Sequence, residues 1–273
     1  MTTQKTIFIT GASSGIGKAT AEYFAAQGWN VAATMRNPSD ALTETSTLKK
    51  FVLDVQDKSS ISKAVKDSIA AFGKIDVVLN NAGYGTAGVL ESGTDEQIRR
   101  QFDVNFFGLV DVIRTFLPHF RENKSGLFMN VSSIGGLITL PMFSIYHATK
   151  WAVEGLTESL QYELNPLGIE LKLIEPGGVK TDFAGRSLDM FQNETDEHYQ
   201  KTITRMLKNF EGTERSANYS TPEQMAEGIF NAATDGKKQL RYVLGNDAQQ
   251  LWQARQNMPY QDFREMIRGN MLG

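Results

Sequence analysis

The chain has 273 residues, of which 41% are hydrophobic and 22% are charged, so one large domain spanning residues 1–273 can bury a full core. Its formal net charge of −3 offers no basic field for a nucleic acid or an anionic membrane. It contains no cysteine and only three scattered histidines, which excludes disulfides and thiolate sites and argues against a metal site.

The N-terminus shows no basic and then apolar signal region, and no apolar run reaches the ~18 residues of a membrane span. We therefore expect a cytoplasmic protein.

Strand-like and helix-like segments alternate along the chain. Short apolar runs predict strands at 5–10, 30–35, 50–54, 75–80, 126–132, 169–175 and 239–244. Helical patterns lie at 15–27, 57–72, 95–120, 145–165 and 222–235, and two of them begin with capping signals at Thr94 and Thr221. This alternation predicts an α/β fold of the Rossmann type, with a doubly wound parallel sheet of about seven strands and helices on both faces.

The first predicted strand runs into a glycine-rich loop, T-G-A-S-S-G-I-G, that opens the first predicted helix. Glycines at such a point permit a tight turn and a close approach to phosphate, and the helix N-terminus supplies N–H donors. The spacing differs from the usual G-x-G-x-x-G, and a bare glycine cluster is often only a turn. Its position between first strand and first helix favours dinucleotide binding through Gly11, Ser13, Ser14, Gly15, Ile16 and Gly17.

A second cluster of polar residues follows the strand predicted at 126–132. Ser133 lies just beyond that strand, and Tyr146 and Lys150 are four residues apart, on one face of the helix predicted at 145–165. A nearby ammonium favours the phenolate and lowers the pKa of a tyrosine, which would suit Tyr146 to proton transfer. By itself, this pair could equally be a surface lysine beside a half-buried tyrosine.

Seven motifs in order resemble the short-chain dehydrogenase/reductase family. They are T-G-A-S-S-G-I-G from Thr10, L-D-V from Leu53, N-N-A-G from Asn80, V-N-F-F-G from Val104, S-S-I-G-G from Ser132, Y-H-A-T-K from Tyr146 and P-G-G-V-K-T from Pro176. The resemblance covers about residues 5–182, with a looser fit at 222–244.

The resemblance implies a role for each matching residue. Tyr146 would be the general acid/base, Ser133 the hydrogen-bond donor to the substrate oxygen, Lys150 the ligand of the nicotinamide ribose, and Asn105 the holder of a water that links Lys150 to solvent. The remaining matches would contact the cofactor: Asp54, Val55, Asn81, Ala82, Gly83, Pro176, Gly177, Val179 and Thr181.

The second predicted strand indicates which nicotinamide cofactor is used. Folds that prefer NAD place a carboxylate at the end of this strand, but here Met35 occupies the expected position and Arg36 follows. A guanidinium suits a 2′-phosphate, and Ser13 or Ser14 could assist, so we expect NADP(H). An Arg36 that merely pairs with a surface acid is the alternative interpretation.

Residues 183–220 and the tail at 246–273 are expected to form a substrate lid. Both are rich in bulky apolar side chains, and Ile203, Met206, Leu207 and Phe210 have helical spacing. Together with Leu140, Met142 and Phe143 they suggest a pocket for an apolar ketone or aldehyde. The alternative is that they only close the fold.

The interpretation from sequence is an NADP(H)-dependent oxidoreductase acting on a small carbonyl or alcohol, closest to the branch with hydroxysteroid and retinol dehydrogenases. A homo-oligomer is possible in this family. A catalytically silent NADP-binding sensor or scaffold is the main rival. A sugar epimerase or dehydratase, and a reductase of carrier-bound ketoacyl groups, fit the chain length and the apolar lid less well.

Overall fold

The computed structural model describes residues 4–38, 42–181, 187–192, 194–210 and 218–273. Its centre is a seven-stranded sheet in the order β3-β2-β1-β4-β6-β7-β9, with every neighbouring pair parallel. The strands are β1 (Thr6–Thr10), β2 (Asn30–Met35), β3 (Leu48–Val52), β4 (Val77–Asn80), β6 (Gly126–Val131), β7 (Ile169–Pro176) and β9 (Arg241–Leu244). The predicted seven-stranded parallel sheet is therefore confirmed.

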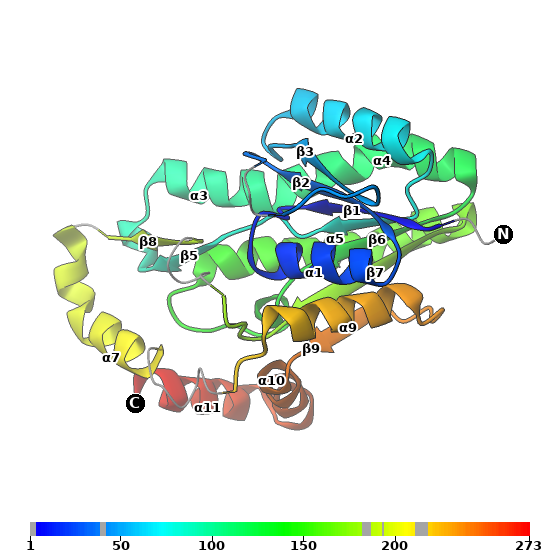
Figure 1. The fold of residues 1–273 in the computed structure, drawn as a ribbon. Helices are drawn as coiled ribbons and strands as arrows, with labels where there is room; N and C mark the ends of the chain where they lie inside the picture. Colours follow the sequence, from blue (N-terminus) through cyan, green and yellow to red (C-terminus); the bar gives the residue numbers. More distant parts are fainter. Residues whose placement is uncertain (1–3, 39–41, 182–186, 193, 211–217) are drawn as a thin grey trace.

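Helices cover both faces of the sheet (Figure 1). One face packs against α1 (Gly15–Ala26) and α9 (Pro222–Thr234), and the other against α2 (Lys58–Phe72), α4 (Gly108–Asn123) and α5 (Ser144–Leu164). Successive strand residues point to opposite faces, so Ile7 joins the core under α1 while Phe8 joins the core under α4. Both faces of the strands are buried, which explains their nearly continuous apolar sequences.

Some predicted boundaries were wrong. The helix predicted at 95–120 is divided into α3 (Asp95–Phe102), a π-helical turn η2 (Asp103–Phe107) and α4. Strand β3 begins and ends two residues before its predicted position, and β4 begins at Val77. A small second sheet pairs β5 (Gly85–Gly88) with β8 (Leu188–Phe191), and was missed because β5 is too short and too rich in glycine to show a period.

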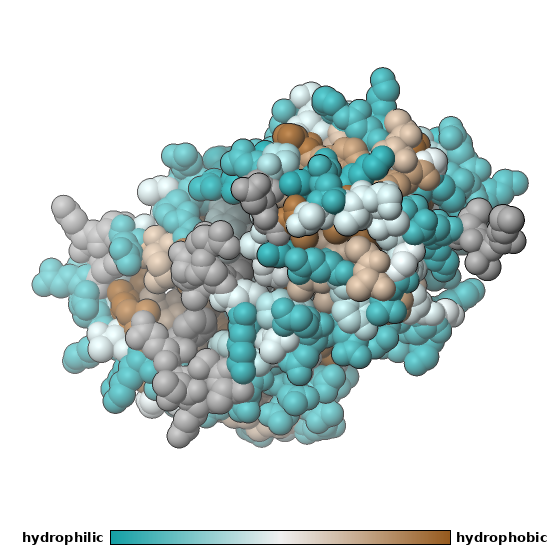
Figure 2. Space-filling model, in the orientation of Figure 1, coloured by the Kyte–Doolittle hydropathy of each residue, from teal (hydrophilic) through white to brown (hydrophobic). Residues whose placement is uncertain are grey.

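The rest of the described chain forms short turns and further helices. Short 3-10 turns occur at η1 (Leu90–Ser92), η3 (Ile134–Gly136), η4 (Asn165–Leu167) and η5 (Glu194–Tyr199), and helices at α7 (Gln200–Phe210), α10 (Asn246–Asn257) and α11 (Tyr260–Leu272). The predicted helical spacing from Ile203 to Phe210 is confirmed by α7, which packs against α11. Figure 2 shows a largely hydrophilic face, with hydrophobic colour over α7 and also around α2 and the strands beside it. No helix among the described residues is long and apolar enough to cross a membrane.

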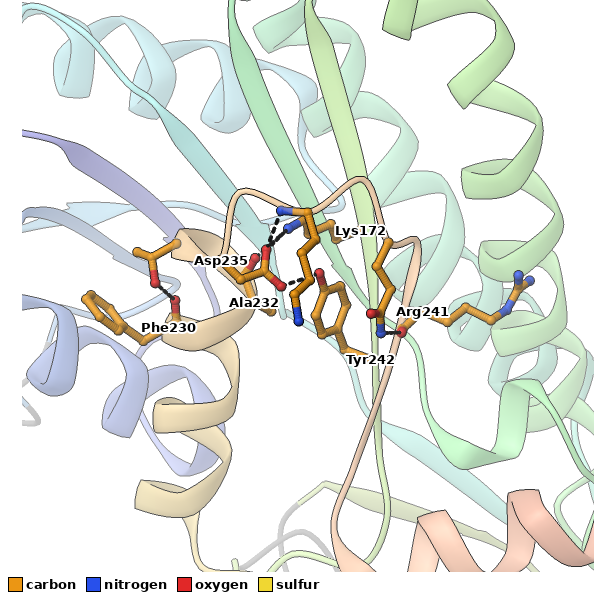
Figure 3. A network of polar contacts seen from close by, with 9 residues as sticks. Lys172, Phe230, Ala232, Asp235, Arg241 and Tyr242 are labelled. Atoms are coloured by element: carbon orange, nitrogen blue, oxygen red, sulfur yellow. Dashed lines mark hydrogen bonds and ion pairs between the residues drawn. The ribbon is translucent and has the colours of Figure 1, made fainter.

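A buried lysine ties two strands to α9 (Figure 3). Lys172 on β7 is almost fully buried, and its Nζ donates to the carbonyl of Ala232 and to the Asp235 carboxylate, both at 2.7 Å. The Tyr242 hydroxyl on β9 donates to the other Asp235 oxygen at 2.7 Å. Although partial burial acts against it, these hydrogen bonds hold the pKa of Asp235 at about 2, so the carboxylate stays charged.

Candidate active site

The end of β6 and the first turns of α5 bring three predicted site residues together. Ser133 follows β6, and its side chain is hydrogen-bonded to the Tyr146 hydroxyl. Lys150 lies one helical turn after Tyr146, with its Nζ 5.7 Å from the Tyr146 ring centre. Lys150 also donates to the carbonyl of Val131 at 2.9 Å, which fixes the ammonium between strand and helix.

Burial dominates the electrostatics of this cluster. It raises the pKa of Tyr146, and the hydrogen bond from Ser133 only partly opposes that increase. Burial also lowers the pKa of Lys150 to about 8, while the carboxylate of Glu154 acts in the opposite direction. The pKa of Tyr146 thus lies above its ordinary value, because removal of the phenol from water disfavours the phenolate. The expected lowering of this pKa by Lys150 stays a prediction.

The loop that carries Ser133 is held by a histidine that sequence reasoning did not select. His147 Nδ1 lies 2.8 Å from the carbonyl of Gly135, and the backbone N–H of Leu140 donates to Nε2 at 2.9 Å. Since Nε2 accepts, the ring proton is on Nδ1 and donates to Gly135. Ser133 Oγ itself accepts from the Gly135 N–H at 3.0 Å. The sequence signal that could have indicated this role was the position of His147 directly after Tyr146.

Asn105 lies in the π-helical turn between α3 and α4, in a conformation that often marks functional sites. Its side-chain oxygen accepts from the N–H of Tyr84, and its amide donates to the Tyr84 carbonyl and to Thr149 Oγ1. Asn105 thus joins the segment after β4 to the helix of Lys150. Its expected water-mediated link to Lys150 stays a prediction.

The glycine loop forms a tight cradle at the carboxyl ends of β1 and β4. Gly11 has a φ of 71°, and a Cβ there would lie 2.9 Å from the Cα of Ala82, so this position requires glycine. Asn81 fastens the loop by donating to the carbonyls of Thr10 and Gly11.

The cradle also presents free donors to a bound group. Among described residues, α1 has no side-chain cap at Ser14 and no acid in its first turn, so its N–H groups and dipole favour an anion. Ser13 is exposed and Ile16 half-buried in the same loop. Gly15 faces Thr181, with 3.4 Å between its hypothetical Cβ and Thr181 Cγ2, so the two predicted cofactor segments meet across the site. A dinucleotide therefore fits the residues present.

At the end of β2, the side chains of Arg36 and Met35 differ in their exposure to solvent. Arg36 is exposed, and no described acid pairs with it. Met35 stands at the position where a fold that prefers NAD places a carboxylate, and its side chain is 3% exposed and packs in the core under α1. At the neighbouring end of β3, Asp54 accepts from the Gln56 N–H, and Val55 packs against Gly108.

The segment after β7 depends on a tail residue that the sequence did not reveal. Pro176 is buried at the end of β7, and Asp247, at the start of α10, accepts from the N–H of Gly178 at 2.7 Å. A Cβ at Gly177 would clash with the Asp247 carboxylate. Val179 is half-buried and pairs with Ser220.

An apolar cluster encloses Tyr146. Ala87, Phe143 and Met206 are buried at its centre, and Leu140, Met142, Leu188, Met190 and Leu272 pack around them. Side chains from the β6–α5 loop, β8, α7 and the C-terminus therefore meet beside the phenol. Phe183 of the expected lid, like residues 211–217, lies outside the described residues, as does the Phe210 side chain.

Most of the tail contributes to a different contact. Phe263, Ile267 and Met271 of α11 pack with Ile134 and Ile138, which belong to the loop that follows Ser133. The tail therefore packs mainly against this loop. Of the tail residues, only Leu272 reaches the apolar cluster around Tyr146.

Comparison with known proteins agrees with this geometry. A family model described as short chain dehydrogenase matches residues 5–191. The 3-ketodihydrosphingosine reductase of Bacteroides thetaiotaomicron is 39% identical over 240 residues, which cover 88% of this chain and 87% of that protein.

Solved structures are similar as well. A short-chain dehydrogenase from Streptomyces avermitilis has a TM-score of 0.82 at 30% identity, covering 98% of this chain and 99% of that one. A 3-ketoacyl-(acyl-carrier-protein) reductase from Brucella melitensis, complexed with NADH, has a TM-score of 0.73 at 25% identity, covering 88% and 96%.

Proposed function

This chain belongs to the short-chain dehydrogenase/reductase family of oxidoreductases, and we propose that it transfers a hydride between NADP(H) and an apolar ketone or aldehyde. The observation that carries the proposal is the contact of Ser133 with Tyr146, one turn from Lys150, inside an apolar cluster. The cluster excludes water from the reacting atoms, and the three polar groups supply hydrogen bonds and a proton.

The side chains divide the chemistry of reduction among them. The hydroxyl of Ser133 donates a hydrogen bond to the carbonyl oxygen, which stabilises the negative charge that develops there. Tyr146 donates its proton to the same oxygen, and Lys150 stabilises the phenolate that remains. Oxidation of the alcohol uses the same groups in reverse.

The fit of the glycine cradle supports a dinucleotide cofactor. The N–H groups of Gly15, Ile16 and Gly17 would hold the pyrophosphate, while Asn81 to Gly83 and Asp54-Val55 would border the adenosine. When bound, the reduced nicotinamide supplies the hydride. Pro176, Gly177, Val179 and Thr181 would orient it, with Asp247 fixing the backbone of this segment.

Arg36 favours NADP over NAD. Its exposed guanidinium at the end of β2 can form charge-assisted hydrogen bonds with a 2′-phosphate. The NADH in the similar reductase structure belongs to that protein, so the preference proposed for this chain depends on Arg36.

The apolar cluster supports a substrate with an extended apolar part. Three of its members are methionines, Met142, Met190 and Met206, whose flexible side chains adapt to ligands of different shape. The similarity to 3-ketodihydrosphingosine reductase, named for a ketone, supports the same substrate class.

A silent sensor or scaffold is the rival function. Such a protein needs the glycine cradle but not the hydrogen-bonded pair of Ser133 and Tyr146, nor Asn105 buried beside the helix of Lys150. Retention of the whole set favours the enzyme.

The test is to incubate the purified protein with NADPH and a series of ketones and aldehydes of increasing apolar length, following the absorbance of the reduced nicotinamide. We expect turnover that improves with apolar length. NADPH binding without turnover of any compound would favour the sensor.

A further inference from the structure

One buried histidine holds both ends of the loop that follows Ser133. His147 lies in the first turn of α5, directly after Tyr146, and is 4% exposed. Its Nδ1 lies 2.8 Å from the carbonyl oxygen of Gly135, and its Nε2 lies 2.9 Å from the backbone nitrogen of Leu140. The two nitrogens of one imidazole ring therefore contact the loop at two points, near its beginning and near its end.

The two partners give the ring nitrogens opposite roles. A carbonyl oxygen can only accept and a backbone N–H can only donate, so Nδ1 carries the ring proton and Nε2 accepts. A doubly protonated ring would direct its second N–H against the N–H of Leu140 and break that contact. His147 thus serves as a neutral imidazole with one fixed donor and one fixed acceptor.

The donor side of the ring fixes the backbone beside Ser133. The Gly135 N–H donates to Ser133 Oγ at 3.0 Å, while the Gly135 carbonyl accepts from His147. A Cβ on Gly135 would lie 2.7 Å from His147 Nδ1 and 3.4 Å from Ser133 Oγ, so the ring packs directly on this backbone. Because Ser133 accepts from Gly135, its own proton remains available for the substrate oxygen. A shift of Gly135 would move that hydroxyl.

The acceptor side of the ring fixes the apolar wall of the proposed site. The side chain of Leu140 packs in the cluster around Tyr146, together with Met142 and Phe143. The Phe143 ring centre lies 6.0 Å from that of His147 and 6.4 Å from that of Tyr146. The place of Leu140 in this wall therefore depends on Nε2 of His147, and the place of Ser133 depends on Nδ1.

A second histidine shows what a structural contact alone looks like. His119 on α4 accepts from the N–H of Ile75 at 3.1 Å. Ile75 lies just before β4 begins, whereas Ser133 follows the end of the parallel neighbour β6, so the two histidines lie toward opposite ends of the sheet. His147 differs because both of its nitrogens are engaged and both partners lead to the proposed site.

We propose that His147 is a positioning residue with two separable roles. Its Nδ1–H holds Ser133 in place for the substrate oxygen, and its Nε2 holds Leu140 in place for the apolar part of the substrate. The inference rests on the proposed reduction, and no proton passes through the ring. Turnover and selection of the substrate by size are thereby assigned to opposite sides of one imidazole.

Two amide variants separate these roles. Asn places its amide near the position of Nδ1, so His147→Asn keeps a donor for Gly135 and loses the acceptor for Leu140, whereas Gln reaches the position of Nε2 and His147→Gln does the reverse. The measurement is kcat and KM for a small and an extended apolar ketone at saturating NADPH. We expect His147→Gln to lower kcat roughly five- to tenfold for both ketones, the effect of one hydrogen bond. His147→Asn should raise KM roughly fivefold for the extended ketone only, with kcat within about twofold of wild type.

A double variant tests whether His147 acts through Ser133. In a Ser133→Ala protein, His147→Gln should lower kcat by less than about twofold further, because the hydroxyl that it positions is already absent. His119→Asn, which removes the acceptor of Ile75, is the matched control and should leave both kinetic constants within about twofold of wild type. The same change of kcat and KM in both amide variants, or losses that multiply in the double variant, would overturn the proposal.

A second measurement needs neither turnover nor a folded His147 variant. The chain has three histidines, so nitrogen NMR of protein labelled only at histidine gives three sets of ring signals, and His119→Asn and His198→Asn identify the set of His147 by elimination. At neutral pH this set should show a protonated Nδ1 and an unprotonated Nε2. The opposite tautomer or a charged ring would overturn the proposal. If the expected tautomer is found but no carbonyl compound is reduced, the proposed function fails and the anchored loop stands.

Discussion

Replacing Arg36 by alanine should weaken NADPH binding without affecting NADH. A charge-assisted hydrogen bond contributes about 1.5–3 kcal/mol, and the lower value applies here because Arg36 is exposed and its charge is screened by solvent. About 1.5 kcal/mol corresponds to a roughly tenfold increase in the Kd of NADPH. The Kd of NADH should change less than about twofold, since NADH has no 2′-phosphate to lose a partner.

Both dissociation constants can be measured by nicotinamide fluorescence titration. Lys63→Ala, which removes an exposed cation from α2, is the matched control for net charge. Arg36→Lys should retain part of the preference, because it keeps the charge but loses the bidentate geometry. Equal weakening of NADPH and NADH by Arg36→Ala would refute the assignment, as would a wild-type protein that binds the two equally.

Two further predictions concern the apolar cluster around Tyr146 and the buried ion pair of Lys172 with Asp235. Met206→Ala should lower kcat/KM about tenfold for extended apolar ketones and less than about twofold for small ones, because a contact of roughly 1.5 kcal/mol with the apolar part of the substrate is lost. Leu207→Ala, at the more exposed neighbouring residue, is the control. Equal losses for extended and small ketones would contradict a substrate pocket. Lys172→Met should lower the free energy of unfolding by about 2 kcal/mol in denaturant titrations, because Asp235 loses its cation but can partly rehydrate; an unchanged midpoint would show that the pair contributes nothing.

The sheet was predictable because its strands are buried on both faces. The apolar runs that end in Thr10, Met35 and Val131 left few other interpretations, and the glycines of the first loop marked where the sheet meets its first helix. The pairing of Tyr146 with Lys150 followed from helical spacing alone.

The remaining features depend on contacts between distant segments. The core position of Met35 depends on the packing of β2 against α1, which the sequence of the strand alone does not show. Asp247 contacts Gly178 although the two residues are 69 positions apart, and no local sequence pattern predicts that contact. The upward pKa shift of Tyr146 comes from burial of the phenol, and the extent of that burial depends on packing that the sequence alone does not give.

The central claim is that Tyr146 transfers the proton, and Tyr146→Phe tests it most directly. The ring that packs in the apolar cluster is retained, and only the hydroxyl is removed. General acid–base groups contribute about 10²–10⁴-fold, so kcat for ketone reduction should fall by at least ~10²-fold while the Kd of NADPH stays within about twofold. A Tyr146→Phe enzyme that keeps roughly a tenth of the wild-type kcat would contradict this assignment.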